Sequence, residues 1–170
     1  GKYHLMGCIL SAASARSWWL EQILSTEDYA HDESILEDSN VVFLPYLNGE
    51  RSPHNDVNAR GAFIHLSSIT TRGQMSKSIL EGVAFAIKDC LEVAKENGII
   101  PTKTTICGGG AKSNTWKQVI ADVLEIPVYT LKTNQGPSYG AAILAMVGDG
   151  KYASVEDAVS HIIKVSDCIE

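Results

Sequence analysis

The sequence lacks the charge patterns and the apolar runs that mark several large classes of protein. Its 170 residues carry a formal net charge of -6 and contain no run of Lys or Arg. The basic footprint that nucleic acids and anionic lipids require is therefore absent. The longest apolar stretches are far shorter than the roughly 20 residues that cross a bilayer as a helix. We therefore expect no nucleic-acid partner and no membrane partner.

Closely spaced metal ligands are missing as well. The cysteines form no CxxC pair, and the five histidines show no HxxxH or HExxH spacing, although such spacings are typical of zinc sites. We assign no metal ligand, and we expect small buried or half-buried thiols in a reducing cytoplasm at Cys8, Cys90, Cys107 and Cys168. The chain starts abruptly within what reads as folded sequence, without a signal peptide. We therefore interpret Gly1 as the boundary of a fragment.

Strand and helix patterns alternate along the chain, which predicts an α/β fold. The length suggests one domain over residues 1–170. The clearest element is a helix over 71–97, in which apolar residues recur every four positions. Thr71 and Gln74 have the spacing of a capping box, and Gly98 follows the helix as a C-terminal cap. The other predicted elements are helices over 9–24, 114–125 and 139–147, strands over 41–44, 61–66, 104–107 and 127–131, and a last helix that starts at Ser154.

Three consecutive glycines, Gly108, Gly109 and Gly110, stand between a predicted strand and a predicted helix. Backbone N–H groups at the start of a helix bind phosphates, and glycine lets a ligand approach the backbone closely. Two familiar nucleotide motifs do not fit. The P-loop needs a glycine where Ala111 stands, and the dinucleotide fingerprint needs one where Ser113 stands. A tight turn requires one glycine, so three in succession favour the approach of a ligand.

A second glycine-rich segment, residues 136–142, also leads from a strand into a helix. Its small residues, Gly140 among them, suit close packing of helices, which is the simpler interpretation of this segment alone. Two such turns are, however, expected at the same edge of the sheet, where open α/β proteins bind their ligands. Together they favour a binding site at that edge.

Five segments resemble, in the same order, motifs of one known family, the FGGY carbohydrate kinases. Residues 43–54 (FLPYLNGERSPH) are similar to a segment of its xylulokinase branch, and residues 80–85 (LEGVAF) to part of the second family signature. Residues 107–116 (CGGGAKSNTW) resemble the adenosine motif. Residues 3–19 and 136–142 resemble two further family segments, so the resemblance covers nearly the whole chain.

The resemblance implies an actin-like ATPase (ribonuclease H-like) fold, with a mixed sheet and flanking helices. Members of the family hold ATP, with its Mg²⁺, between two lobes. This chain would be the C-terminal, nucleotide-binding lobe, without the N-terminal lobe that completes the sugar site. Where relatives often have Gly, this chain has Ala13. The resemblance places Gly110 at the phosphates with Gly109 beside it, Asn114 at the adenine, and Ala13 and Ser17 at the border of the nucleotide. Gly108 and Gly140 are further candidate contacts.

No catalytic residue is assigned, because the resemblance places the catalytic aspartate of the family in the N-terminal lobe. Asp32, Asp38 and Asp56 sit in polar stretches and are expected to be solvated surface. The role of Glu50 and Arg51 is open between anion recognition by the guanidinium and bracing of their loop. Bracing is slightly favoured.

The resemblance favours a cytoplasmic ATP-dependent kinase that converts D-xylulose to D-xylulose 5-phosphate. Ribulose, gluconate, fuculose and rhamnulose are alternative substrates. The chain alone is expected to bind ATP or ADP weakly and to show no turnover. A non-enzymatic actin-like or chaperone-type ATPase lobe is an alternative, because a fold does not fix a function. A sugar-binding sensor is another, although it would usually bring a basic DNA-binding helix. The oligomeric state is open, with a homodimer as one option.

Overall fold

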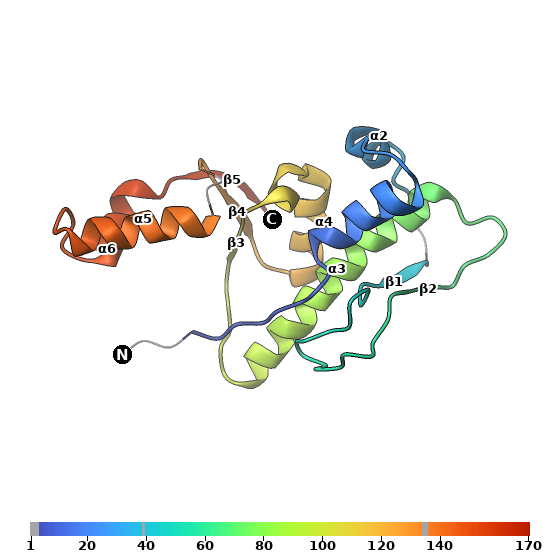
Figure 1. Ribbon diagram of the computed structural model, residues 1–170, viewed down its shortest axis with the longest axis horizontal. Helices are drawn as coiled ribbons and strands as arrows, with labels where there is room; N and C mark the ends of the chain where they lie inside the picture. Colours follow the sequence, from blue (N-terminus) through green and yellow to red (C-terminus); the bar gives the residue numbers. More distant parts are fainter. Residues whose placement is uncertain (1–3, 39, 134–135) are drawn as a thin grey trace. The chain divides into compact units, whose positions relative to one another are not determined.

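The computed structural model of the chain describes residues 4–38, 40–133 and 136–170 (Figure 1). The chain divides into two compact units. The first unit consists of Gly1–Pro101 and Asp122–Glu125, and the second unit of Thr102–Ala121 and Ile126–Glu170. That all residues act as one domain stays a prediction. Within the described ranges, no helix is long and apolar enough to cross a membrane.

The first unit begins with helical segments: α1 (Ala13–Ser17), the π-helix η1 (Trp18–Ile23) and α2 (Tyr29–Ser34). The prediction of a helix over 9–24 was wrong at its start, because the preceding residues have partners outside any helix. The Leu10 N–H donates to a carboxylate oxygen of Glu50 at 3.1 Å. The Cys8 carbonyl accepts from the Ser52 N–H at 3.0 Å. The bond to Ser52 takes up the Cys8 carbonyl, whereas the Leu10 N–H would have no partner within a helix that starts at residue 9.

Strands β1 (Val42–Leu44) and β2 (Ala62–Ile64) pair antiparallel and lie beside the long helix α3 (Arg72–Glu96) (Figure 1). Phe43 stands opposite Phe63, with the ring centroids 4.7 Å apart. Helix α3 approaches β1 most closely at Gly82, where a Cβ would lie 2.2 Å from the Phe43 carbonyl oxygen. Glycine at this position is therefore a requirement of packing.

The ends of α3 agree with the helix predicted over 71–97. The Thr71 hydroxyl accepts from the Gln74 N–H at 3.2 Å, and the Gln74 side chain accepts from the Thr71 N–H at 3.1 Å, which completes the predicted capping box. Gly98 follows with a φ of 78°, as expected of a glycine that ends a helix. The apolar face of α3 is buried. The core of the first unit comprises Ala15, Trp19, Leu20, Val41, Phe43, Ile79, Leu80, Val83, Ala84, Ala86, Ala94 and Leu124.

The second unit contains strands β3 (Thr104–Ile106), β4 (Val128–Leu131) and β5 (Val165–Ile169), the 3-10 helix η2 (Gly109–Lys112), and helices α4 (Asn114–Leu124), α5 (Gly136–Gly148) and α6 (Val155–Ile162). The last turn of α4 belongs to the first unit. Strand β4 pairs parallel with β3 and antiparallel with β5, so the sheet is mixed, as predicted. The carboxyl ends of β3 and β4 consequently lie at one edge. Helices α5 and α6 pack side by side (Figure 1).

Strand β5 is the element that the sequence prediction missed. The sequence predicts that Ile163 or Val165 lies on the inner face of the last helix, but α6 ends before both, and the chain pairs with β4, with Tyr129 opposite Cys168. The start of α6 is as predicted, since the Ser154 hydroxyl accepts from the Asp157 N–H at 3.1 Å. A five-residue strand carries little signal of its own, and pairing with its neighbour decides its conformation.

Candidate functional site

The triple glycine forms the turn between β3 and α4. Gly108 has a φ of 85°, a left-handed conformation that glycine adopts without strain. Gly109 is exposed, and no heavy atom lies within 4 Å of the point where its Cβ would stand. A Cβ on Gly110 would lie 3.4 Å from the Trp116 ring, an ordinary contact. The geometry of the turn thus accounts for Gly108, whereas packing does not account for Gly109.

Asn114 is the first residue of α4 and is exposed. The preceding residue caps the helix, since the buried Ser113 hydroxyl accepts from the Trp116 N–H at 3.0 Å. The Asn114 side chain is therefore not needed as a cap. Its amide can donate and accept hydrogen bonds at the same time. That chemistry suits the edge of a nucleotide base, which presents donors beside acceptors.

A pocket of about 290 Å³ opens in the second unit, beside the carboxyl ends of β3 and β4. It is lined by Ile106, Ala111, Lys112, Lys117, Thr130, Leu131, Thr133, Ser166 and Asp167. Lys117 is 5% exposed, and its ammonium lies 3.6 Å from a carboxylate oxygen of Asp167. Ala111 and Lys112 come from the glycine turn, so the turn and the pocket are continuous. Hydroxyl and ammonium groups suit a polar, anionic ligand.

Gly140 lies one turn into α5, is exposed, and has open space where its Cβ would stand. Gly136 begins the helix with a φ of 51°. Residues four positions apart share one face of a helix. That face therefore has no side chain at these two positions, which allows the close approach of a ligand or of another backbone.

Ala13 and Ser17 are the first and last residues of α1 and share one of its faces. Ala13 is exposed and Ser17 is half-buried. The Ser17 hydroxyl lies 2.9 Å from the Tyr29 hydroxyl, which in turn donates to a Glu21 carboxylate oxygen at 3.0 Å. The Ser17 side chain is thus oriented by a residue of another helix.

The structure places the predicted nucleotide contacts in two sets. Ala13 and Ser17 lie together in the first unit. The triple glycine and Asn114 lie together in the second unit, to which Gly140 also belongs. That both sets face the same nucleotide stays a prediction.

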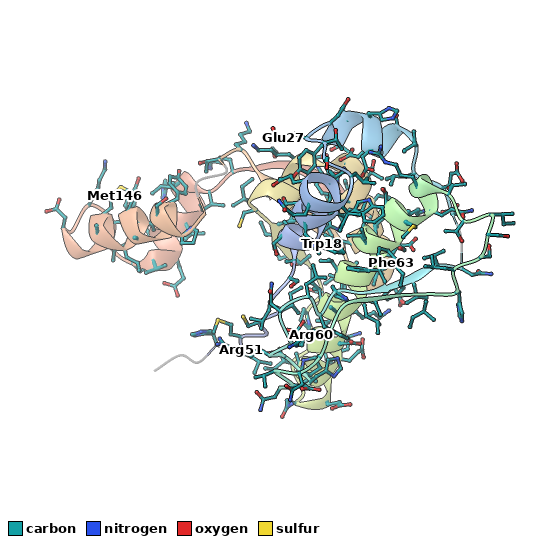
Figure 2. The ribbon with its side chains drawn as sticks, turned by 45° about the vertical axis from the view of Figure 1, so that its right-hand side comes forward. Trp18, Glu27, Arg51, Arg60, Phe63 and Met146 are labelled. Carbon is teal, nitrogen blue, oxygen red and sulfur yellow. The ribbon has the colours of Figure 1, made fainter. Side chains whose placement is uncertain are left out.

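The loop between β1 and β2 carries a buried carboxylate. Glu50 is 3% exposed, and one of its oxygens accepts from the Leu10 N–H at 3.1 Å and from the Arg51 N–H at 2.7 Å. The bracing that the sequence favours is thus provided by this carboxylate through backbone amides. The Arg51 side chain is exposed (Figure 2). Because Leu10 precedes α1, the brace holds the segment that leads into that helix.

Replacement of Glu50 by Ala is expected to lower the free energy of unfolding by about 2 kcal/mol, because two backbone N–H groups lose their acceptor. Urea denaturation of the full-length protein measures the change as a lower midpoint at an unchanged slope. Arg51→Ala is the matched control on the same loop, and it should change the free energy by less than ~0.5 kcal/mol. Equal losses in the two variants would contradict the brace.

Asp32 corrects the expectation that the aspartates of the polar stretches are solvated. It is 1% exposed. Its carboxylate accepts from the Ser76 hydroxyl at 2.6 Å and from the Arg72 guanidinium at 3.4 Å, and the Arg16 guanidinium lies 3.8 Å away. A carboxylate buried to this extent requires such partners. The other two aspartates are exposed, as predicted.

Sequence reasoning missed Lys117 and Tyr29. Helical spacing could have found Lys117, since it precedes Ile120 and Leu124 by three and seven positions and so lies on the buried face of α4. Tyr29 has no such local signal, because its hydrogen-bond partners come from α1 and η1.

One family model matches most of the chain: the C-terminal domain of the FGGY family of carbohydrate kinases matches residues 1–148. The chain belongs to this family. A xylulose kinase from Staphylococcus epidermidis is 34% identical over 99% of this chain and 35% of that protein. The structure of a xyloylose kinase from Brucella ovis is similar with a TM-score of 0.87 and 35% identity, over 97% of this chain and 34% of that one. The structure of a xylulose kinase from Rhodospirillum rubrum is similar with a TM-score of 0.81 and 29% identity, over 96% of this chain and 34% of that one.

Membership of the FGGY family confirms the resemblance of the five segments. The predicted fold is also confirmed, because the similar structures are sugar kinases of the actin-like ATPase type. The chain spans about a third of the length of the relatives that it matches. It therefore corresponds to one part of an FGGY kinase, the part that carries the C-terminal domain.

Proposed function

We propose that this chain is the nucleotide-binding C-terminal lobe of an ATP-dependent xylulose kinase that acts in the cytoplasm. The relatives named xylulose kinase support the reaction and the sugar. The proposed nucleotide contacts are Gly108, Gly109, Gly110, Asn114, Ala13, Ser17 and Gly140.

The observation that carries the proposal is the open backbone at Gly109. A side chain would fit there without any local clash, yet the position has none. An exposed turn that precedes a helix directs backbone N–H groups toward solvent, and such groups bind phosphate oxygens. The exposed Lys112 of the same turn adds positive charge near the anionic part of a nucleotide, since the charge of Lys117 is offset by Asp167.

In the proposed reaction, a sugar hydroxyl forms a bond to the γ-phosphorus while the bond from that phosphorus to the bridging oxygen breaks and releases ADP. This chain binds and orients the nucleotide, which is the main task in phosphoryl transfer. Mg²⁺ accompanies ATP and neutralises phosphate charge. Among the described residues, no group of three His, Cys, Asp or Glu side chains gathers as a metal site, so we assign the ion no ligand here. We likewise assign no general base, and we infer that lobe closure excludes water.

ADP is expected to protect Cys107 from alkylation in the full-length protein. The expectation of buried or half-buried thiols was wrong for Cys107 and Cys168, which are exposed. Cys107 immediately precedes Gly108, so a nucleotide on the glycine turn would cover it. Cys168 is also exposed but lies on β5, which makes it an internal control. Mass spectrometry should show slower labelling of Cys107 alone. If ADP does not slow the labelling of Cys107 relative to that of Cys168, the nucleotide does not bind on this turn.

Turnover of the full-length protein on a panel of sugars tests the substrate. D-xylulose is expected to give the highest kcat/KM, ahead of ribulose, gluconate, fuculose and rhamnulose. Nucleotide binding without phosphorylation of any sugar would instead favour a non-enzymatic ATPase lobe. The chain by itself should bind ADP weakly and show no turnover.

A further inference from the structure

Lys117 of α4 is a buried cation whose hydrogen bonds are incomplete. Its side chain is 5% exposed, and an oxygen of the Asp167 carboxylate lies 3.6 Å from its ammonium. That distance allows electrostatic attraction but is too long for a hydrogen bond. Within residues 4–38, 40–133 and 136–170, the ammonium has no hydrogen-bond acceptor. Because buried polar groups are nearly always hydrogen-bonded, the acceptor comes from solvent or from a ligand.

The pocket of about 290 Å³ that Lys117 lines brings further donors to this ammonium. Every residue that lines it belongs to the second unit, so the pocket is formed within one unit. The Thr130 and Ser166 hydroxyls lie 3.1 Å apart. One hydroxyl proton joins the two oxygens, which leaves the other proton for a ligand. The pocket therefore offers O–H donors from β4 and β5 beside the N–H donors of α4.

The charge of the pocket is positive on balance. The carboxylate of Asp167 offsets the ammonium of Lys117. The ammonium of Lys112 is exposed and has no acidic partner within the described part of the chain. An excess of donors and of positive charge favours an oxyanion. A phosphate group presents more acceptor oxygens and more negative charge than a carboxylate does, so it satisfies more of these donors.

We propose that this pocket binds a phosphate group, held by Lys117, Lys112 and the hydroxyls of β4 and β5. The phosphate belongs either to the tail of the nucleotide, since the pocket is continuous with the glycine turn, or to a separate phosphorylated molecule. The inference goes beyond the proposed function, which places the nucleotide on the backbone of the turn, and it does not require a nucleotide. Asp167 weakens the binding of the anion, because its carboxylate lies in the same pocket.

Calorimetry with inorganic phosphate and the full-length protein tests the proposal. Lys117→Met keeps the length of the side chain but removes its donors, so phosphate should bind about tenfold more weakly, as expected for the loss of a charged hydrogen bond. Asp167→Asn should instead tighten the binding about threefold to tenfold, because the pocket gains net positive charge. An ion pair with a purely structural role would give no such gain. Lys103→Met is the matched control, since Lys103 is exposed in the same unit but does not line the pocket.

Competition with ADP identifies the molecule that carries the phosphate. If ADP displaces the phosphate whose binding depends on Lys117, and adenosine does not, the nucleotide tail occupies the pocket. If this phosphate and ADP bind together, a separate phosphorylated molecule occupies it. Either result supports the phosphate site.

Three results would overturn the inference. They are no binding of phosphate to the wild-type protein at about 10 mM, equal binding in Lys117→Met and wild type, or no tighter binding in Asp167→Asn. If Lys117→Met does not fold, the exposed Lys112→Met variant replaces it, with weaker binding again expected. A wild-type protein without ATP-dependent turnover would overturn the proposed function alone, because inorganic phosphate contains no nucleotide.

Discussion

Gly109→Ala should leave the protein folded and remove most of its kinase activity. No heavy atom lies within 4 Å of the added Cβ, so the folded state accommodates the methyl group. The same methyl group would stand where the phosphate tail meets the backbone. A displacement of the tail by about 1 Å is enough to lower kcat/KM for ATP by about a hundredfold. Steady-state kinetics with D-xylulose and the thermal midpoint of unfolding, both on the full-length protein, measure the two effects.

Two other glycines serve as controls, because they separate an effect on kinase activity from an effect on stability. Gly148→Ala also adds a methyl group in open space, at the end of α5, and should leave both activity and stability unchanged. Gly108→Ala should lower the free energy of unfolding by about 1–2 kcal/mol, because an L-residue is strained at a φ of 85°. If Gly109→Ala keeps the wild-type kinetics for ATP, the phosphates do not lie on this turn.

Elements whose ends are set by neighbouring residues could be predicted from the sequence. Helix α3 begins and ends within one residue of its prediction, because Thr71 and Gln74 pair locally and Gly98 stops the helix. The strands before and after the triple glycine were also found, since each is a short run rich in β-branched residues between turn residues. Local hydrogen bonds and steric preferences are sufficient in these places.

Elements that depend on distant partners could not be predicted in this way. The residues before α1 bind to the distant loop between β1 and β2, through Glu50 and Ser52. Strand β5 forms because β4 offers it a partner. Neither partner is apparent from the residues of the segment itself, because the deciding interaction crosses the fold.

The candidate site shows the same division. The glycine turn could be found because its composition is unusual and its position after a strand has a chemical meaning. The direction of the Ser17 hydroxyl could not be predicted from the sequence, because it is set by Tyr29 of α2 and Glu21 of η1. A site formed by one segment can thus be predicted from the sequence, whereas a site that combines residues of several segments can be found only in the structure.

Asp32→Ala should have the largest effect on stability among the substitutions considered. The carboxylate joins α2 to α3 through Ser76 and Arg72, and it lies beside Arg16 of α1. Its removal leaves the buried Ser76 hydroxyl and the half-buried Arg72 guanidinium without this acceptor, while Arg16 keeps its pair with Glu33, and the loss costs about 3 kcal/mol. Because the full-length protein is about three times as long as this chain, its thermal midpoint should fall by about 3 °C.

Asp38→Ala is the matched control, because its carboxylate is 88% exposed although it pairs with Lys77. An exposed pair contributes less than ~1 kcal/mol, so this variant should unfold close to the wild-type temperature. Since Arg16 immediately precedes Ser17, Asp32→Ala should also weaken ADP binding in the fraction that remains folded, which calorimetry below the midpoint measures. A midpoint as high as that of Asp38→Ala would mean that the buried ion pairs do not hold α1, α2 and α3 together.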